Sequence, residues 1–368
     1  MPDLEPFLRL REFLDQLPLG YPKTESGVEL DILRKLFTED EALLATLLSP
    51  LAEEPGRIAE RNGLNPQDLG EKLDSMAGKG LIFRIHRQGK TLYQTAPFMI
   101  GLYEYSVNKM DRELAELCSR YYEEAYQAEM GASNIPGFKV IPVTRRIEAN
   151  LTLFPFEKLK EEIQAARKIA VAECVCRKEG RLTGHGCDYP SETCLSFGSA
   201  AEFYIENKMG REITAEEALS LLEEADRAGL VHAGANTKHL SNICNCCPCC
   251  CASMKGMVTK GHKKEKYMNA LYEAIVNTEE CLACEECLLR CPVQAISVQE
   301  TAQVDRDRCL GCGLCAGVCP TEAICLRLRP DRLEPFNNTM EMGMAILQAK
   351  GERHNDRPFN RIIHRDLF

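Results

Sequence analysis

The chain has 368 residues and a formal net charge of −10, and 45% of its residues are hydrophobic. Such a composition is typical of a folded protein with two or three domains, and the acidic balance argues against nucleic acid as its main partner. No apolar run approaches the length of a membrane span, and the first residues lack the features of a signal peptide. Twenty cysteines without such a signal predict a cytoplasmic protein whose thiols bind metal rather than form disulfides.

Residues 1–100 predict a helical domain that ends in a hairpin. Apolar periodicity and caps, including Asn65 followed by Pro66, indicate helices over residues 1–17, 28–36, 39–48, 55–61 and 66–77. Two short strands follow over residues 81–86 and 91–96. A helix–turn–helix followed by a two-stranded wing resembles the winged-helix fold.

The winged-helix resemblance makes DNA binding one candidate function. The second helix of the pair carries Asp68, Glu71 and Asp74, and acids on this face repel phosphate. The wing, in contrast, carries the basic side chains of Arg84, His86, Arg87 and Lys90. We expect this domain to serve as a protein-docking scaffold or a lid, with nucleic acid as the less favoured partner.

A helical connector and a cysteine-rich domain follow. Residues 101–165 predict mainly helices, interrupted by a proline-containing loop over residues 131–144. Residues 166–270 predict an α/β domain, in which KIAVAECVC, residues 168–176, reads as a buried strand that ends in two cysteines. Thr214 and Glu217 predict the capped start of a helix that Gly229 ends.

Ten cysteines lie between residues 174 and 251, and their pattern allows three hypotheses about the metal site that they form. The first is an iron–sulfur cluster held by a quartet made of Cys174, Cys176, Cys187 and Cys194. In the second, pairing of residues 168–176 with residues 240–247 shares ligands between this quartet and Cys244, Cys246, Cys247, Cys249 and Cys250. The third is structural zinc, because thiolate-rich sites suit both metals. We expect at least one additional [4Fe–4S] cluster here, with zinc as the alternative.

Residues 271–330 contain the spacing C-x2-C-x2-C-x3-C-P twice, 28 positions apart. This doubled run resembles the two-[4Fe–4S] bacterial ferredoxin family over about fifty residues. The resemblance implies that one cluster is held by Cys281, Cys284, Cys287 and Cys319. It implies that the other is held by Cys309, Cys312, Cys315 and Cys291. A pair of zinc sites is the alternative for these eight thiols.

The middle and C-terminal cysteines together resemble uncharacterised proteins of anaerobes. These proteins pair CxCR…GC…C and NCCxCC elements with a C-terminal dicluster ferredoxin, which implies an anaerobic host but no particular reaction. Residues 331–368 predict a helix over residues 339–350 and an apolar tail. The expected fold class is therefore α+β multidomain, with a winged-helix-like domain, a cysteine-rich α/β domain and a dicluster ferredoxin fold.

The cysteine patterns predict an electron carrier or the electron-transfer subunit of an oxidoreductase, with a redox protein as its partner. One alternative is an iron–sulfur redox sensor that regulates transcription through the winged helix. Another is a reductase whose substrate meets an incompletely ligated cluster. No P-loop and no GxGxxG after a strand occurs, so a nucleotide site has no support. The oligomeric state has no signal in the sequence.

Overall fold

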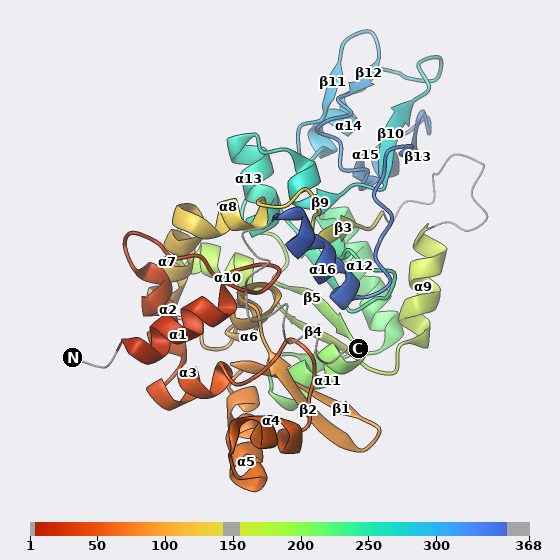
Figure 1. Cartoon of the computed structure of the whole chain (residues 1–368). Helices are drawn as coiled ribbons and strands as arrows, with labels where there is room; N and C mark the ends of the chain where they lie inside the picture. Colours follow the sequence, from red (N-terminus) through yellow and green to blue (C-terminus); the bar gives the residue numbers. More distant parts are fainter. Residues whose placement is uncertain (1–3, 143–154, 352–368) are drawn as a thin grey trace.

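The computed structural model describes residues 4–142 and 155–351 (Figure 1). Within these residues, every helix is too short or too polar to cross a bilayer. The chain folds as a mixed α/β structure in which the ferredoxin-like segment projects from one end (Figure 1). The apolar tail predicted after residue 351 lies outside the described residues.

The N-terminal part contains helices followed by one antiparallel hairpin. The helices are α1 (Glu5–Leu14), α2 (Val28–Leu36), α3 (Glu39–Ala45), α4 (Pro55–Asn62) and α5 (Pro66–Gly78). Strands β1 (Ile82–Arg87) and β2 (Lys90–Thr95) form the hairpin. As expected from its position, the Asn65 side chain accepts a hydrogen bond from the backbone N–H of Gln67 at 2.9 Å. These elements agree with the predicted ones, and membership of the winged-helix family stays a prediction.

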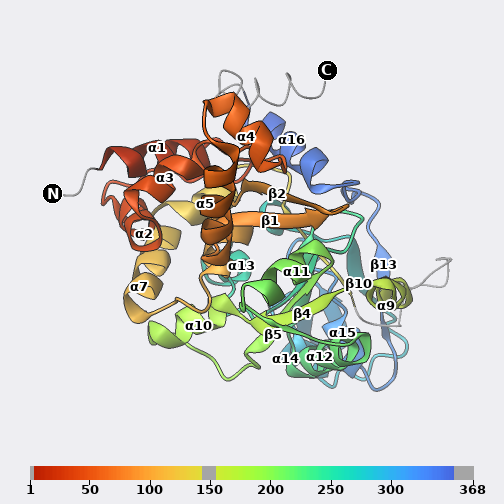
Figure 2. The ribbon, with the colours of Figure 1, turned by 90° about the horizontal axis from the view of Figure 1, so that it is seen from below.

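Arg84, His86 and Lys90 of the wing pair with acids of the same molecule. Arg84 donates to Asp74 at 3.0 Å and to Glu206 of α11 (Ser199–Glu206) at 2.8 Å. Lys90 donates to Glu54 at 2.7 Å. The hairpin also contacts the middle of the molecule, because α11 packs against β1 (Figure 2). The ion pairs of Arg84 and Lys90 partly neutralise the positive charge of the hairpin.

A helical segment joins the hairpin to the middle sheet. It comprises η1 (Phe98–Leu102), α6 (Tyr103–Tyr105), α7 (Arg112–Tyr121), η2 (Tyr122–Tyr126) and α8 (Gln127–Met130), with η2 as a π-helical turn between α7 and α8. The rings of Tyr21, Phe98 and Tyr121 pack with centroids 4.7–5.3 Å apart. These aromatic residues are buried, so they belong to the core.

Seven strands form the central sheet in the order β6-β4-β5-β8-β7-β3-β9, and only β3 and β9 pair in parallel. Their bounds are β3 (Phe138–Val140), β4 (Ile169–Glu173), β5 (Glu192–Phe197), β6 (Arg211–Glu212), β7 (Val231–Ala235), β8 (Asn242–Cys246) and β9 (Met268–Asn269). Two predictions were wrong here. Residues 138–140, expected in a loop, form β3. Residues 168–176 do not pair with residues 240–247, because β5 lies between β4 and β8.

The two faces of this sheet are covered by different helices. Val171 and Leu195 pack with residues of α9 (Pro155–Ala165) and α12 (Ala215–Ala228). Their strand neighbours Ala170 and Ala172 point the other way, toward the larger core that includes α11. The same alternation places Cys194 of β5 on the face opposite to α9 and α12.

The ferredoxin-like segment is built from two similar halves. Its strands form two antiparallel pairs, β10 (Tyr272–Val276) with β13 (Ile324–Leu328) and β11 (Ile296–Val298) with β12 (Ala302–Val304). The helices α14 (Glu286–Arg290) and α15 (Leu314–Val318) contact each other. The remaining elements are α10 (Val175–Leu182), α13 (Ala252–Lys260), η3 (Lys264–Lys266) and α16 (Thr339–Ala349). Just after α16, Lys350 donates to the Pro18 carbonyl at 2.7 Å, which ties this end of the chain to the N-terminal helices.

A buried carboxylate holds the base of the ferredoxin-like segment. Glu273 of β10 is only 3% exposed and accepts hydrogen bonds from Arg306 at 2.7 Å and Arg327 at 2.8 Å. The buried Arg329 lies 3.6 Å from the same carboxylate and donates to the Cys309 carbonyl at 2.9 Å. Burial raises the pKa of Glu273, but the hydrogen bonds from Arg327 and Arg306 outweigh it and hold the pKa below its ordinary value.

Replacing Glu273 with Gln should therefore lower the stability of this segment by about 2 kcal/mol at neutral pH, because the buried Arg329 loses its counter-charge. A carboxyl whose pKa falls on folding adds stability above its unfolded pKa, and this contribution is lost as the pH drops through the folded pKa. The difference between wild type and Glu273→Gln should shrink below about pH 4.5. Urea unfolding followed by circular dichroism across this range measures it, and a pH-independent difference would contradict the assignment.

Candidate iron–sulfur centres

Eight cysteines of the ferredoxin-like segment line two separate cavities. One cavity, with about 330 Å³ of space, is lined by Cys291, Cys309, Cys312 and Cys315. The other, with about 320 Å³, is lined by Cys281, Cys284, Cys287 and Cys319. In each cavity three thiols come from one half of the segment and the fourth from the other half. These are the same two sets of thiols that the ferredoxin resemblance implies as cluster ligands.

Backbone N–H groups point at several of these sulfur atoms. Ala295 donates to Cys291 Sγ at 3.2 Å, and Ala302 donates to Cys281 Sγ at 3.3 Å. Cys309 Sγ accepts from Ala274 at 3.5 Å and from Gly311 at 3.4 Å. Such donors favour a thiolate over a thiol and tune the potential of a cluster bound to it. The donor set therefore fits [4Fe–4S] clusters.

The two cavities differ in exposure. Burial raises the pKa of Cys312 to about 12 and also raises that of Cys315, so these free thiols would stay protonated without a metal. Cys284 in the other cavity is exposed. Leu282, which also lines this cavity, is 68% exposed, and Leu289 of α14 is 79% exposed. The cavity around Cys284 is thus the more accessible of the two.

The middle domain contains a larger cavity in which six thiols converge. Its space is about 600 Å³, close to twice that of either ferredoxin cavity. Seven cysteines line this cavity. Six of them define what we call the six-thiol cavity, namely Cys174, Cys176, Cys194, Cys244, Cys246 and Cys251, and the seventh, Cys247, belongs to a neighbouring group. These residues come from β5, from β8 and from the starts of α10 (Val175–Leu182) and α13. Helix N-termini favour negative charge, so the position of Cys174 and Cys251 suits thiolates.

Strand register brings some of these thiols together directly. Because Leu195 pairs with Ile243 in the antiparallel β5–β8 ladder, Cys194 lies opposite Cys244. A hydrogen bond from Cys194 lowers the pKa of Cys244, and one from Cys176 lowers the pKa of Cys174. The prediction that residues 168–176 form one strand was wrong for residues 174–176, because β4 ends at Glu173, Cys174 is the N-cap of α10 and Cys176 lies in its first turn.

A buried guanidinium accompanies the six thiols. Arg177 is fully buried and donates to the Asn245 carbonyl at 2.9 Å and to the Thr193 hydroxyl. Burial lowers the pKa of Arg177, but Cys174 and Cys247 outweigh this effect and keep the side chain charged. A fixed positive charge at this position offsets the negative charge that several thiolates would bring into the interior.

Glu104 and Cys251 also line the six-thiol cavity, and neither was among the predicted site residues. Burial raises the pKa of Glu104 to about 8, although the Gly101 N–H donates to its carboxylate at 2.9 Å. Glu104 comes from α6, about seventy residues before the first middle cysteine, so no local spacing pointed to it. Cys251 directly follows Cys250, and a run of adjacent cysteines does not reveal which way each side chain points.

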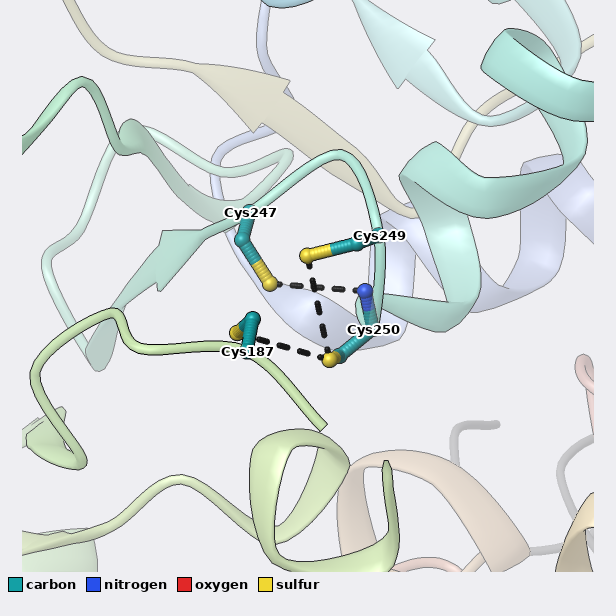
Figure 3. A group of neighbouring side chains, drawn as sticks. All are labelled: Cys187, Cys247, Cys249 and Cys250. Carbon is teal, nitrogen blue, oxygen red and sulfur yellow. Dashed lines mark hydrogen bonds between the residues drawn. The ribbon is translucent and has the colours of Figure 1, made fainter. Parts of the chain in front are cut away.

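The remaining middle cysteines form a four-thiol group beside that cavity. Cys187, Cys247, Cys249 and Cys250 have all their sulfur atoms within 4.8 Å of one another (Figure 3). Cys187 lies in the loop between α10 and β5, whereas the other three lie between β8 and α13. The structure therefore divides the predicted quartet, because Cys187 lies apart from Cys174, Cys176 and Cys194. Cys247 also reaches the wall of the six-thiol cavity, so the two groups adjoin.

Gly311 packs closely against the backbone of Tyr272 in β10, and this contact provides a test of the ferredoxin fold. Gly311 has φ +64°, and a Cβ added there would overlap the carbonyl group of Tyr272. Gly311→Ala should cost more than about 1 kcal/mol and lower the iron content of the Cys309 cavity, because backbone atoms cannot give way. Gly317→Ala is the matched control, since nothing lies within 4 Å of its added Cβ. Equal iron content and thermal stability for both variants would refute the role of Gly311.

Comparison with known protein families gives a match to the segment that contains the two ferredoxin cavities. Residues 274–326 match the 4Fe-4S dicluster domain. No curated protein matches the chain. The matched residues include all eight cysteines of the two ferredoxin cavities. The chain is therefore an iron–sulfur protein with a C-terminal 4Fe-4S dicluster domain and a cysteine-rich middle region.

Proposed function

We propose that the protein transfers electrons between a redox partner and a third iron–sulfur cluster bound in the six-thiol cavity. The two sets of four cysteines in residues 274–326 would each hold one [4Fe–4S] cluster. A [4Fe–4S] cluster supplies single-electron transfer, and the protein supplies its ligands, hydrogen bonds and surroundings. The observation that carries the proposal is the convergence of six thiols and Arg177 in one buried cavity next to a dicluster domain.

The surface around Cys284 suits contact with a redox protein. Leu282 and Leu289 are strongly exposed, and apolar side chains grouped on a surface mark interaction sites. Leu282 lines the ferredoxin cavity that contains the exposed Cys284, so a partner docked there would lie close to a cluster. Glu285 and Glu286 line the same cavity and favour a partner with a positively charged surface.

The buried interior of the six-thiol cavity suits a resident cluster rather than free thiols. Cys194 and Cys244 lie directly across from each other on neighbouring strands, and without a metal Cys194 keeps its proton, because two adjacent buried thiolates would repel each other. Arg177 is held by backbone and side-chain acceptors on β8 and β5, so its charge is fixed in position. A metal cluster would join these thiolates and share the positive charge of the iron among them.

Iron and sulfide content tests the third cluster. An anaerobic preparation should contain about twelve irons per chain, and Cys194→Ser with Cys244→Ser should lower this by about four. The ferredoxin signals in electron paramagnetic resonance should stay unchanged, because their ligands are elsewhere. Cys325→Ser serves as the control, since it removes a cysteine outside every group described above. About eight irons in the wild type, with no loss in the double variant, would overturn the third cluster.

The charge of Arg177 should set the potential of the third cluster. Arg177→Gln should lower the potential by about 60 mV, which corresponds to about 1.4 kcal/mol for a one-electron couple, because a positive charge stabilises the reduced form. Arg177→Lys keeps the charge and should shift the potential less. Redox titration followed by electron paramagnetic resonance separates this signal from the ferredoxin signals. Equal potentials in both variants would show that the guanidinium charge does not act on a cluster there.

A further inference from the structure

We propose that Cys187, Cys247, Cys249 and Cys250 bind a single zinc ion, separate from every iron–sulfur cluster of the protein. Cys250 Sγ lies 3.6 Å from Cys187 Sγ and 3.8 Å from Cys249 Sγ. A zinc–sulfur bond of about 2.3 Å in a tetrahedron places the sulfur atoms about 3.8 Å apart. The two distances therefore match the edges of a tetrahedral four-thiolate site.

The close spacing of these sulfur atoms argues against a cubane at this position. A [4Fe–4S] core of irons and sulfides stands between its thiolates and keeps them farther apart than one metal ion does. Among residues 4–142 and 155–351, this is the one set of three or more histidine, cysteine or acidic residues whose donor atoms come within 4.8 Å of one another. The cysteines of the ferredoxin cavities do not form such a set. The four-thiol group thus differs in kind from the cluster sites.

Zinc fits the group better than iron does. Four thiolates complete a tetrahedral shell and leave no open position, which is typical of structural zinc. For the same ligands, divalent zinc also binds more tightly than divalent iron. The backbone N–H of Cys250 donates to Cys247 Sγ at 3.4 Å, which helps to stabilise a thiolate there.

The position of the group indicates what the zinc would do. It would join the long loop between α10 and β5 to the turn after β8, two segments that lie far apart in the sequence (Figure 3). Cys247 packs on Ala225 and Leu230, at the end of α12. Arg290 of the dicluster domain donates to the Arg227 carbonyl at 2.9 Å at that same helix end. A zinc ion here would brace the surface on which the dicluster domain rests.

Metal analysis of the full chain tests the proposal. The wild type, produced with both iron and zinc available, should contain about one zinc per chain. Cys249→Ser and Cys187→Ser should each lower zinc at least about fivefold, while the iron content stays unchanged and shows that the chain is folded. Cys249 is exposed, so its replacement disturbs packing least. Cys325→Ser is the control and should retain its zinc.

Cobalt provides a second measurement on the same site. Chains produced with cobalt in place of zinc should show the absorption of tetrahedral cobalt bound by thiolates, and Cys249→Ser should remove it. A wild type without zinc would overturn the proposal. A loss of about one iron from Cys249→Ser would overturn the choice of zinc, and a loss of about four would overturn a single-ion site. None of these readouts depends on electron transfer, so the zinc site is tested separately from the proposed function.

Discussion

The buried positive charge of Arg177 offsets the negative charge that thiolates would bring into the middle of the molecule. Several thiolates brought into an apolar interior would raise the free energy of folding, because buried like charges repel and lose their hydration. Arg177 lies fully buried beside them and is held by Asn245 and Thr193. Since a guanidinium stays protonated at any physiological pH, its compensation does not depend on conditions. The six-thiol cavity depends on this one cation.

The sheet explains how cysteines far apart in sequence come to share this cavity. In β5 and β8 the apolar residues Leu195 and Ile243 face α9 and α12, so alternate positions face the opposite core. Cys194 and Cys244 occupy those alternate positions. Two helix N-termini then add Cys174 and Cys251 at the edge of the same face. The hydrophobic pattern of the strands therefore decides which thiols can reach a common metal.

The grouping of the eight ferredoxin cysteines into two sets could be predicted from sequence because most of their geometry is local. Loops of two residues between cysteines bring three thiols around one cluster, and the repeat supplies the fourth. The grouping of the middle cysteines could not be predicted this way, since it depends on β5 lying between β4 and β8. Cys176 was placed in a strand because Cys174, the helix N-cap, makes no side-chain cap and gave no signal of a helix start. Glu104 reached the cavity through tertiary packing alone. The helices and hairpin of residues 1–100, with their clear periodicity and caps, were predicted closely.

The number of thiols in the cavity bears on whether a substrate binds there. A cubane needs four ligands, and six thiols exceed that number, so a cluster in this cavity has enough protein donors to leave no iron open. An open iron is what the reductase alternative needs, and the donor set therefore favours electron transfer over substrate binding at this site. The wing adds a similar argument against the sensor alternative, since Arg84 and Lys90 already pair with acids of the same molecule. With charge on the wing partly neutralised and acids on α5, contact with phosphates has little support.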